Sequence, residues 1–303
     1  MRIKGPGLSA LAAILLFPFG SDAQSPDVKF AHGADYTFER MQAVRTTDDE
    51  GQITLIAYVY RPVKTVGREV VIFNHGSTGG WATSPKEPVA LTRSYIEYFI
   101  RRGFILVIPL RRGFGESSGS YREECAYQAG KCTLAESRAV AERALPEASK
   151  DLDAVIDQLV IGKLAPPEAK ILMVGQSRGG FLSLYYAANR PEMVKGVISF
   201  VGGQASISNK WPPEENAARM KLHEKVASSA GAALKVPTLW IYGARDSFYE
   251  EGASSQWFKA FKDAGGKGEY VFISDHSLEN GHYVIRSLDL WEATVDKYLS
   301  QLP

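Results

Sequence analysis

The sequence contains two copies of a pattern that can carry a serine nucleophile, Gly-x-Ser-x-Gly. The first copy centres on Ser117 in RGFGESSGSY, and the second centres on Ser177 in MVGQSRGGFL. A serine hydroxyl in this pattern attacks a carbonyl carbon after a neighbouring base takes its proton. At most one of the two serines can be that nucleophile, so the segments around each copy decide between them.

The second copy has the local structure that an activated serine needs. An apolar strand is predicted at 171–174, and a helix is predicted at 181–189. Between them Ser177 occupies a tight turn, where Gly175 and Gly179 relieve the crowding of the backbone. The start of the helix also favours developing negative charge. We therefore predict that Ser177 is the nucleophile.

The first copy has a strand before it but no helix after it. The segment after Ser117, YREECAYQAGKC, is predicted to be a loop that holds the only two cysteines, Cys125 and Cys132. In a chain that we expect to be exported, these cysteines are predicted to pair as a disulfide. Ser117 is therefore predicted to have no catalytic role.

Five histidines compete for the role of the base. Two of them, His276 and His282, follow the last predicted strand. The sequence ENGHYV favours His282, because Gly281 lets a loop bring the ring to the serine. His276 is then a residue of the site's rim. The remaining three are placed in the lead-in, in a loop with another use and on the surface of a predicted helix, and they are His32, His75 and His223.

The acid that orients the histidine is predicted to be Asp246. It follows a buried strand in LWIYGARDSF, and catalytic groups of parallel sheets gather at the carboxyl ends of the strands. Asp275 is the alternative, with a role as a turn residue favoured instead. The chain order Ser177, Asp246, His282 is that of one particular family of Ser-His-Asp triads.

A site of this kind also needs two backbone N–H groups that bind the developing oxyanion. The N–H of Arg178 is predicted to be one of them, because it follows the nucleophile at the start of the helix. The other is predicted in the glycine-rich segment NHGSTGGW, at Ser77 or, alternatively, at Thr78. The three glycines of this segment let its backbone approach a substrate.

The elements that must position these residues alternate between strand and helix. The predicted strands are 38–46, 53–62, 69–76, 104–110, 170–175, 194–203, 236–246 and 268–274, and the predicted helices are 88–103, 144–160, 178–190 and 287–302. The first two strands form an antiparallel hairpin. Continuous apolar strands that alternate with helices indicate an α/β fold with a mostly parallel sheet covered on both faces.

Two local expectations accompany this assignment. The helix at 144–160 is predicted to begin near Pro146, with Asp151, Asp153 and Asp157 on a solvated face. Residues 24–36 are polar and are predicted to form an irregular lead-in.

The segments NHGSTGGW, RRGFGESSG, GQSRGG, YGARD and NGHY, in this order, resemble the α/β-hydrolase superfamily. Within it, the chain is similar to the dienelactone-hydrolase-like and serine-aminopeptidase-like branches, over about residues 35–300. The resemblance implies a sheet of about eight strands with the second strand antiparallel. It also implies that the loop around Ser117 is structural, since this superfamily has such a loop after its fourth strand.

The sequence departs from those branches at two positions. Dienelactone hydrolases use a cysteine nucleophile, whereas this chain has Ser177, which favours ester hydrolysis. Arg178 stands where an apolar residue is more common. Its side chain either binds a carboxylate of the substrate or forms a local ion pair, and the residues leave both alternatives open.

In this superfamily a cap over the site is inserted where this chain has residues 204–235. The segment contains a short amphipathic helix with Pro212-Pro213 at its entry. A small cap indicates an accessible pocket and short acyl groups, with Trp81 and Trp211 as candidate substrate-binding residues. Glu214 and Glu215 are either a solvated helix start or a site for the amine of a peptide.

Length and composition agree with a globular protein of this class. The chain has 303 residues, of which 45% are hydrophobic and 23% are charged. Its net charge of +1 gives no electrostatic reason to expect a nucleic-acid partner. The proposed chemistry needs no cofactor, and the sequence shows no spacing typical of a metal site.

The first residues are predicted to be a secretory signal peptide. Arg2 and Lys4 precede an apolar run at 8–19, and small residues allow cleavage after Ala23. The run is too short for a stable membrane anchor. We therefore expect a signal peptide at 1–23, one hydrolase domain at 24–303, and export to the periplasm or the medium.

The sequence thus predicts an exported serine hydrolase that cleaves small carboxylic esters. A serine peptidase that trims short peptides is the first alternative, followed by a thioesterase or lipase. A non-catalytic binding protein on a hydrolase scaffold is the alternative from another class. The oligomeric state is not indicated by the sequence.

Overall fold

A computed structural model of the chain describes residues 27–29, 35–63, 69–77, 93–125 and 130–303. The predicted signal peptide, His32, Thr78 and Trp81 lie outside these residues. Among the helices described, none is long and apolar enough to cross a membrane.

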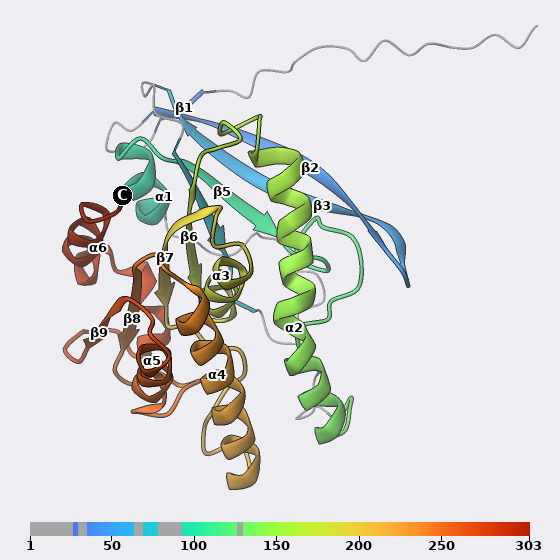
Figure 1. Ribbon diagram of the computed structural model, residues 1–303, viewed down its shortest axis with the longest axis vertical. Coiled ribbons are helices and arrows are strands. Elements are labelled where there is room, and N and C mark those ends of the chain that lie inside the picture. Colours follow the sequence, from blue (N-terminus) through green and yellow to red (C-terminus); the bar gives the residue numbers. More distant parts are fainter. Residues whose placement is uncertain (1–26, 30–34, 64–68, 78–92, 126–129) are drawn as a thin grey trace, which may run out of the picture.

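One nine-stranded sheet forms the centre of the molecule, with the strand order β1-β2-β3-β5-β4-β6-β7-β8-β9 (Figure 1). The strands are β1 (Asp27–Lys29), β2 (Asp35–Thr47), β3 (Gly51–Pro62), β4 (Val70–Asn74), β5 (Ile105–Leu110), β6 (Ile171–Gln176), β7 (Val194–Phe200), β8 (Thr238–Gly243) and β9 (Gly268–Ile273). Strands β4 to β9 run parallel, and β3 pairs antiparallel with β2 and β5. Apart from the three-residue β1, this is the expected sheet of eight strands with an antiparallel second strand.

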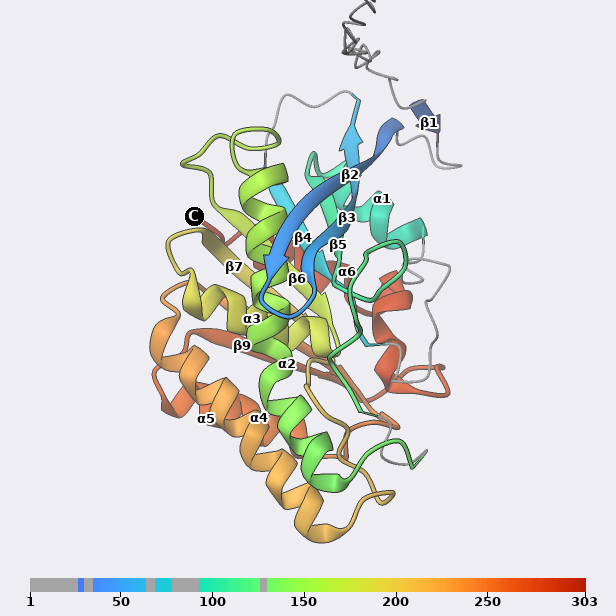
Figure 2. The same ribbon diagram turned by 90° about the vertical axis from the view of Figure 1, so that its right-hand side faces the viewer.

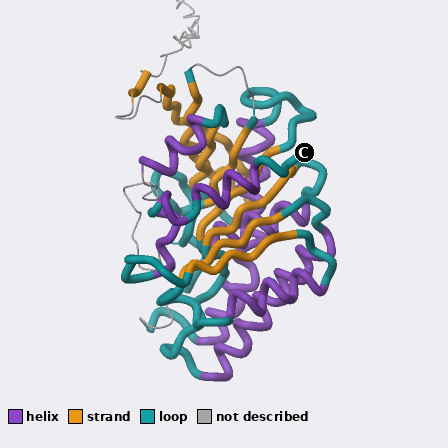
Figure 3. The backbone as a smooth tube through the Cα atoms, turned by 90° about the vertical axis from the view of Figure 1, so that its left-hand side faces the viewer, coloured by secondary structure: helices purple, strands orange, loops and turns teal. Residues whose placement is uncertain are grey.

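Helices cover both faces of this twisted sheet (Figures 2 and 3). They are α1 (Arg93–Arg101), α2 (Leu134–Val155), α3 (Arg178–Asn189), α4 (Pro213–Ala233), α5 (Ala253–Asp263) and α6 (Glu292–Leu299). The helices α2 to α5 lie side by side on one face, and α1 and α6 lie on the other (Figure 2). Every residue of β4, β5, β7 and β8 is therefore buried, which explains their continuous apolar sequences. The predicted α/β fold is confirmed.

Two predicted boundaries were wrong. Helix α2 begins at Leu134, well before Pro146, because Thr133 and Glu136 form a capping box at its start. Pro146 lies inside the helix. The lead-in is also not wholly irregular, since β1 pairs antiparallel with β2.

Asp151 was predicted to lie on a solvated face of α2. This prediction is wrong, because Asp151 is only 2% exposed. Its carboxylate accepts hydrogen bonds from the Arg45 side chain and, at 3.0 Å, from the backbone N–H of Arg112. Arg45 lies on β2, so this ion pair joins α2 to the long β2–β3 hairpin. Burial raises the pKa of Asp151, and the two arginines only partly oppose that effect.

Most of the predicted cap, residues 204–235, belongs to α4. This helix has 21 residues and packs against α3 and α5, as a layer helix does. His223 was expected on the surface of this helix, but it is fully buried. The His223 ring stacks on Trp257 at 4.1 Å between centroids. A covering role for this segment stays a prediction.

His223 holds the chain that follows β7. Its Nδ1–H donates to the Arg219 carbonyl at 2.6 Å, and its Nε2 accepts from the backbone N–H of Gln204 at 2.8 Å and of Ala205 at 3.3 Å. Only the neutral ring can accept those two bonds. Burial is the main cause that lowers the pKa of His223 to about 3.

We expect Asp151→Ala to lower the free energy of unfolding by about 3 kcal/mol, because Arg45 and Arg112 lose their most buried carboxylate partner and keep the more exposed Glu147 and Glu50. Urea unfolding at pH 7 measures this loss. The control is Asp263→Ala, which removes the exposed pair with Lys259 on α5 and should cost no more than about 0.5 kcal/mol. Equal effects of the two substitutions would contradict the structural role of Asp151.

Acid is expected to destabilise the fold through His223. The unfolded ring titrates near its ordinary pKa and the folded ring near 3, so the unfolded state binds more protons between these values. Stability is therefore lost as pH falls below about 6.5. Between pH 7 and pH 5 the native protein should lose about 2 kcal/mol more than His223→Gln, measured by urea unfolding at both pH values. Parallel losses would show that His223 is not responsible.

Candidate active site

The backbone at Ser177 has the strained conformation of a tight strand-to-helix turn. Ser177 follows β6, precedes α3, and has φ 53° and ψ −124°, which few residues other than glycine adopt. A Cβ on Gly175 would collide with the carbonyl of Gly179, and one on Gly179 would collide with the carbonyl of Asn74. Both positions therefore require glycine.

Hydrogen bonds to the chain around the end of β7 hold this turn in place. The Ser177 N–H donates to the Phe200 carbonyl at 2.9 Å, and the Ser177 carbonyl accepts from the Gly203 N–H at 3.1 Å. The strain is thus supported by the neighbouring strand, and the serine side chain is presented at the carboxyl end of the sheet.

Asp246 and His282 form a hydrogen-bonded pair at the same end of the sheet. The His282 Nδ1–H donates to Asp246 Oδ2 at 2.9 Å, and the two side chains are 6% and 7% exposed, respectively. The other oxygen of Asp246 accepts from the backbone N–H groups of Phe248 at 2.8 Å and Tyr249 at 3.2 Å. With Nδ1 protonated, Nε2 of His282 is the nitrogen that can act as a base.

Asn280, which the sequence analysis did not select, links the loops that carry Asp246 and His282. Its Oδ1 accepts from the backbone N–H of His282 at 2.9 Å and of Ser247 at 3.2 Å. Its Nδ2 donates to Ser247 Oγ at 2.7 Å. The Asn-Gly dipeptide at 280–281 is a turn signal that indicates such a loop, but not its partner.

The loop that follows Asp246 also brings Tyr249 to the nucleophile. The Tyr249 hydroxyl lies near the Ser177 side chain, and the Tyr249 ring lies 5.5 Å from that of His282. Burial raises the pKa of Tyr249, and the nearby Ser177 hydroxyl only partly opposes that effect. Tyr249 is a second residue that sequence reasoning missed, and no local pattern marks it.

The competing candidates have other positions. The Ser117 hydroxyl donates to the Leu110 carbonyl at 2.7 Å and accepts from the Ile56 N–H at 2.8 Å, which makes it a structural link between β3 and β5. His276 contacts the carbonyl of Ala244 and the side chain of Arg245. The remaining two are His75, which is fully buried, and Asp275, which is exposed.

The loop after β4 passes close to the serine. A Cβ on Gly76 would lie 3.3 Å from the Ser177 Cβ, so the next residue, Ser77, reaches the neighbourhood predicted for the oxyanion-binding N–H groups. The Ser77 hydroxyl donates to Glu124 Oε1 at 2.6 Å. Arg178 donates to the same oxygen at 2.7 Å, and its side chain is only 3% exposed. The local ion pair is therefore the alternative that the structure favours for Arg178.

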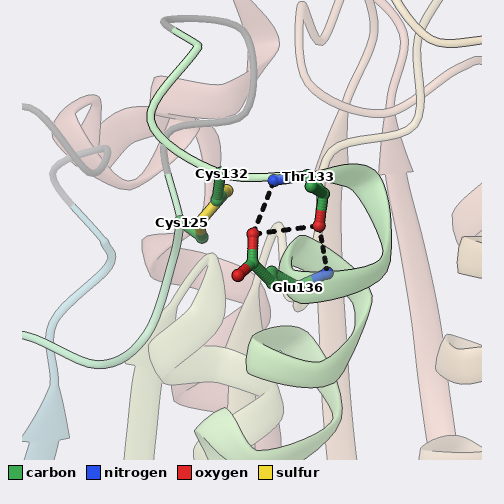
Figure 4. Close-up of a disulfide and its surroundings, with 4 residues drawn as sticks. All are labelled: Cys125, Cys132, Thr133 and Glu136. Carbon is green, nitrogen blue, oxygen red and sulfur yellow. Dashed lines mark hydrogen bonds between the residues drawn. A yellow bond between two sulfur atoms is a disulfide. The ribbon is translucent and has the colours of Figure 1, made fainter.

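Cys125 and Cys132 form the predicted disulfide, with a Cα–Cα distance of 6.3 Å. Cys132 is followed directly by Thr133, the first residue of the capping box of α2 (Figure 4). The disulfide therefore joins the segment after Glu124 to the start of the longest helix described.

The side chains that were predicted to line the site from the cap make contacts within the fold. The Trp211 Nε1–H donates to Ser206 Oγ at 3.0 Å, and the Arg219 guanidinium lies 3.5 Å from the centroid of the Trp211 ring. Glu215 is buried and pairs with Arg138 and Arg219, so it is not part of a solvated helix start. Within the described ranges, no three or more His, Cys, Asp or Glu side chains are grouped to hold a metal ion.

Solved structures with this fold include both esterases and peptidases. An esterase from Pyrococcus furiosus aligns with a TM-score of 0.57 at 16% identity, over 92% of this chain and 99% of that one. An acylaminoacyl peptidase from Pyrococcus horikoshii aligns with a TM-score of 0.60 at 18% identity, over 88% of this chain but only 42% of the peptidase. The chain thus spans about two fifths of that peptidase.

A third similar structure is Est1E from Butyrivibrio proteoclasticus with ferulic acid bound, with a TM-score of 0.53 at 20% identity over 84% of this chain and 99% of that one. No curated protein matches the chain. Identities this low show the shared fold alone. A family model described as alpha/beta hydrolase fold matches residues 69–226, which is just over half of the chain. Together with the sheet order and the turn at Ser177, this match shows that the chain belongs to the alpha/beta hydrolase fold family.

Proposed function

We propose that the protein is an exported serine hydrolase that cleaves small carboxylic esters through Ser177, His282 and Asp246. The observation that carries this proposal is the strained Ser177 turn at the same sheet end as the buried Asp246–His282 pair. A serine held in this conformation exposes its hydroxyl, and a paired histidine supplies the base that activates it.

The proposed reaction has two stages. His282 Nε2 takes the proton of Ser177 Oγ while that oxygen bonds to the ester carbonyl carbon, and the carbonyl oxygen becomes an oxyanion. The N–H groups of Ser77 and Arg178 bind the oxyanion, and His282 then gives the proton to the departing alcohol. Water repeats the sequence on the acyl-enzyme, which releases the acid and free Ser177.

Ester cleavage is preferred to peptide cleavage because of the contacts of Glu215. A peptidase needs a group that holds the amine of its substrate, and Glu214 and Glu215 were the candidates. Glu215 is fully buried, and its two oxygens already face Arg138 and Arg219, which leaves only the exposed Glu214. We also retain, as part of the proposal, the signal peptide at 1–23, the domain at 24–303 with its small cap, and substrate contacts of Trp81 and Trp211.

Export is supported indirectly by the disulfide between Cys125 and Cys132. Disulfides persist mainly in oxidising compartments such as the periplasm and the extracellular medium. The protein is therefore proposed to act outside the cytoplasm on a small-molecule ester.

We expect Ser177→Ala to lower kcat/KM for short nitrophenyl esters by about 10⁴-fold or more, because the acyl-enzyme can no longer form. The assay uses a series from acetate to palmitate, with the short esters turning over fastest. Ser117→Ala is the matched control, since it alters the other Gly-x-Ser-x-Gly copy and should keep kcat/KM within a few-fold. Unchanged turnover by Ser177→Ala would refute the assignment of the nucleophile.

Asn280→Ala is expected to lower kcat about 10- to 100-fold with little change in thermal stability, because a small displacement of His282 weakens proton transfer strongly. Asn189→Ala is the control, since Asn189 lies at the exposed end of α3 and its side chain bonds, among the described residues, only to the Tyr185 carbonyl one turn earlier. The measurement is a steady-state comparison on nitrophenyl acetate. A kcat for Asn280→Ala within twofold of the native value would argue against its positioning role.

A further inference from the structure

One carboxylate oxygen joins the two loops that are proposed to bind the oxyanion. Glu124 Oε1 accepts from the Ser77 hydroxyl at 2.6 Å and from the Arg178 guanidinium at 2.7 Å. Ser77 follows β4 and Arg178 begins α3, so these residues lie 101 positions apart in the sequence. Their backbone N–H groups must keep a fixed separation to bind a single oxygen atom. Glu124 is placed to maintain that separation.

A buried network of alternating charge supports Glu124. Arg178 lies 3.6 Å from Glu123, and Glu123 pairs in turn with Arg111. The side chains of Arg111, Arg178 and Glu123 are each no more than 7% exposed. Two guanidinium groups therefore face two carboxylates, and Glu124 brings no net negative charge to the place where an oxyanion would form.

Arg111 holds the loop after β4 at a second point. Its guanidinium donates to the His75 carbonyl at 2.9 Å, two residues before Ser77. Hydrogen bonds thus hold the loop at two points, from Arg111 to the His75 carbonyl and from Ser77 to Glu124. These contacts leave little freedom for the N–H of Ser77 to move.

The disulfide anchors Glu124 to the rest of the fold. Glu124 is followed directly by Cys125, which is bonded to Cys132, and Cys132 leads into the capped start of α2 (Figure 4). Because α2 is a long helix packed on α3 and the β2–β3 hairpin, the cross-link ties the carboxylate to a rigid element. A free loop would hold Glu124 far less firmly.

We propose that Glu124 is a positioning residue, which holds the backbone N–H groups of Ser77 and Arg178 in register as an oxyanion hole. This inference rests on the proposed ester hydrolysis by Ser177. Glu124 acts through its two hydrogen-bond donors and does not itself contact the reacting atoms. The disulfide keeps it in position.

The test compares Glu124→Ala and Glu124→Gln with the native protein on nitrophenyl acetate. Glu124→Ala should lower kcat about 100-fold, because misplaced oxyanion donors weaken transition-state binding, while KM stays within about threefold. Its inhibition constant for a trifluoromethyl ketone, which adds to serine and forms a bound oxyanion, should rise by a similar factor. Glu124→Gln keeps an acceptor oxygen of the same shape, so it should lose only about 10-fold in kcat.

The matched control is Glu136→Gln, which alters the capping box beside the same disulfide and should leave kcat and the inhibition constant within about twofold. Thermal unfolding of all variants identifies any that fail to fold, and the isosteric Glu124→Gln then decides the result. A rise in KM with kcat unchanged, or equal losses in Glu124 and Glu136 variants, would overturn the positioning role.

The native protein is measured first, so failure of the proposed function is seen separately. If native Ser177 neither turns over esters nor reacts with a fluorophosphonate probe, the proposed function fails, and the role of Glu124 fails with it. If native Ser177 is active and Glu124→Ala keeps its full kcat, only the inference about Glu124 is wrong.

Discussion

The backbone conformation of Ser177 is the constraint on which the architecture around the site depends. A residue with a side chain at φ 53° is strained, and such strain persists only where the surroundings enforce it. Four contacts enforce it here. Gly175 lets β6 approach α3, and Gly179 lets α3 approach the end of β4. The Ser177 N–H donates to the Phe200 carbonyl and the Ser177 carbonyl accepts from the Gly203 N–H, which fixes the turn to the chain at the end of β7. The contacts of the parallel sheet thus hold the turn that presents the Ser177 side chain.

Buried charge supplies the second organising interaction. Asp151 with Arg45, Glu215 with Arg138, and Glu124 with Arg178 each join residues that are distant in the sequence. A buried carboxylate is costly unless a cation and hydrogen bonds accompany it. The pairs therefore help to set how α2 packs on β2, how α4 packs near α2, and how the segment of Glu124 packs on α3.

Three features could be predicted because each depends on neighbouring residues or on residue type alone. They are the strand-to-helix turn, the order of strands and helices, and the disulfide. The glycines around Ser177 mark a turn, continuous apolar runs mark buried strands, and two cysteines allow only one pair. The start of α2 is also marked locally, by Thr133 with Glu136 three residues later, whereas the prediction relied on Pro146. A proline inside a helix removes one backbone hydrogen bond, but tertiary packing can override that cost.

What the sequence alone determined is therefore the backbone path and the residue types at its turns, from Ser177 to the Asp246 and His282 loops. Only the tertiary structure decided which polar groups are buried and with which partners: His223 of α4 against Trp257, Asp151 against β2, Tyr249 beside Ser177, and Glu124 between two loops. The physical reason is that periodicity and turn strain act between near neighbours. Burial and hydrogen bonding join residues that are far apart in the chain, and a single sequence does not show which of them meet.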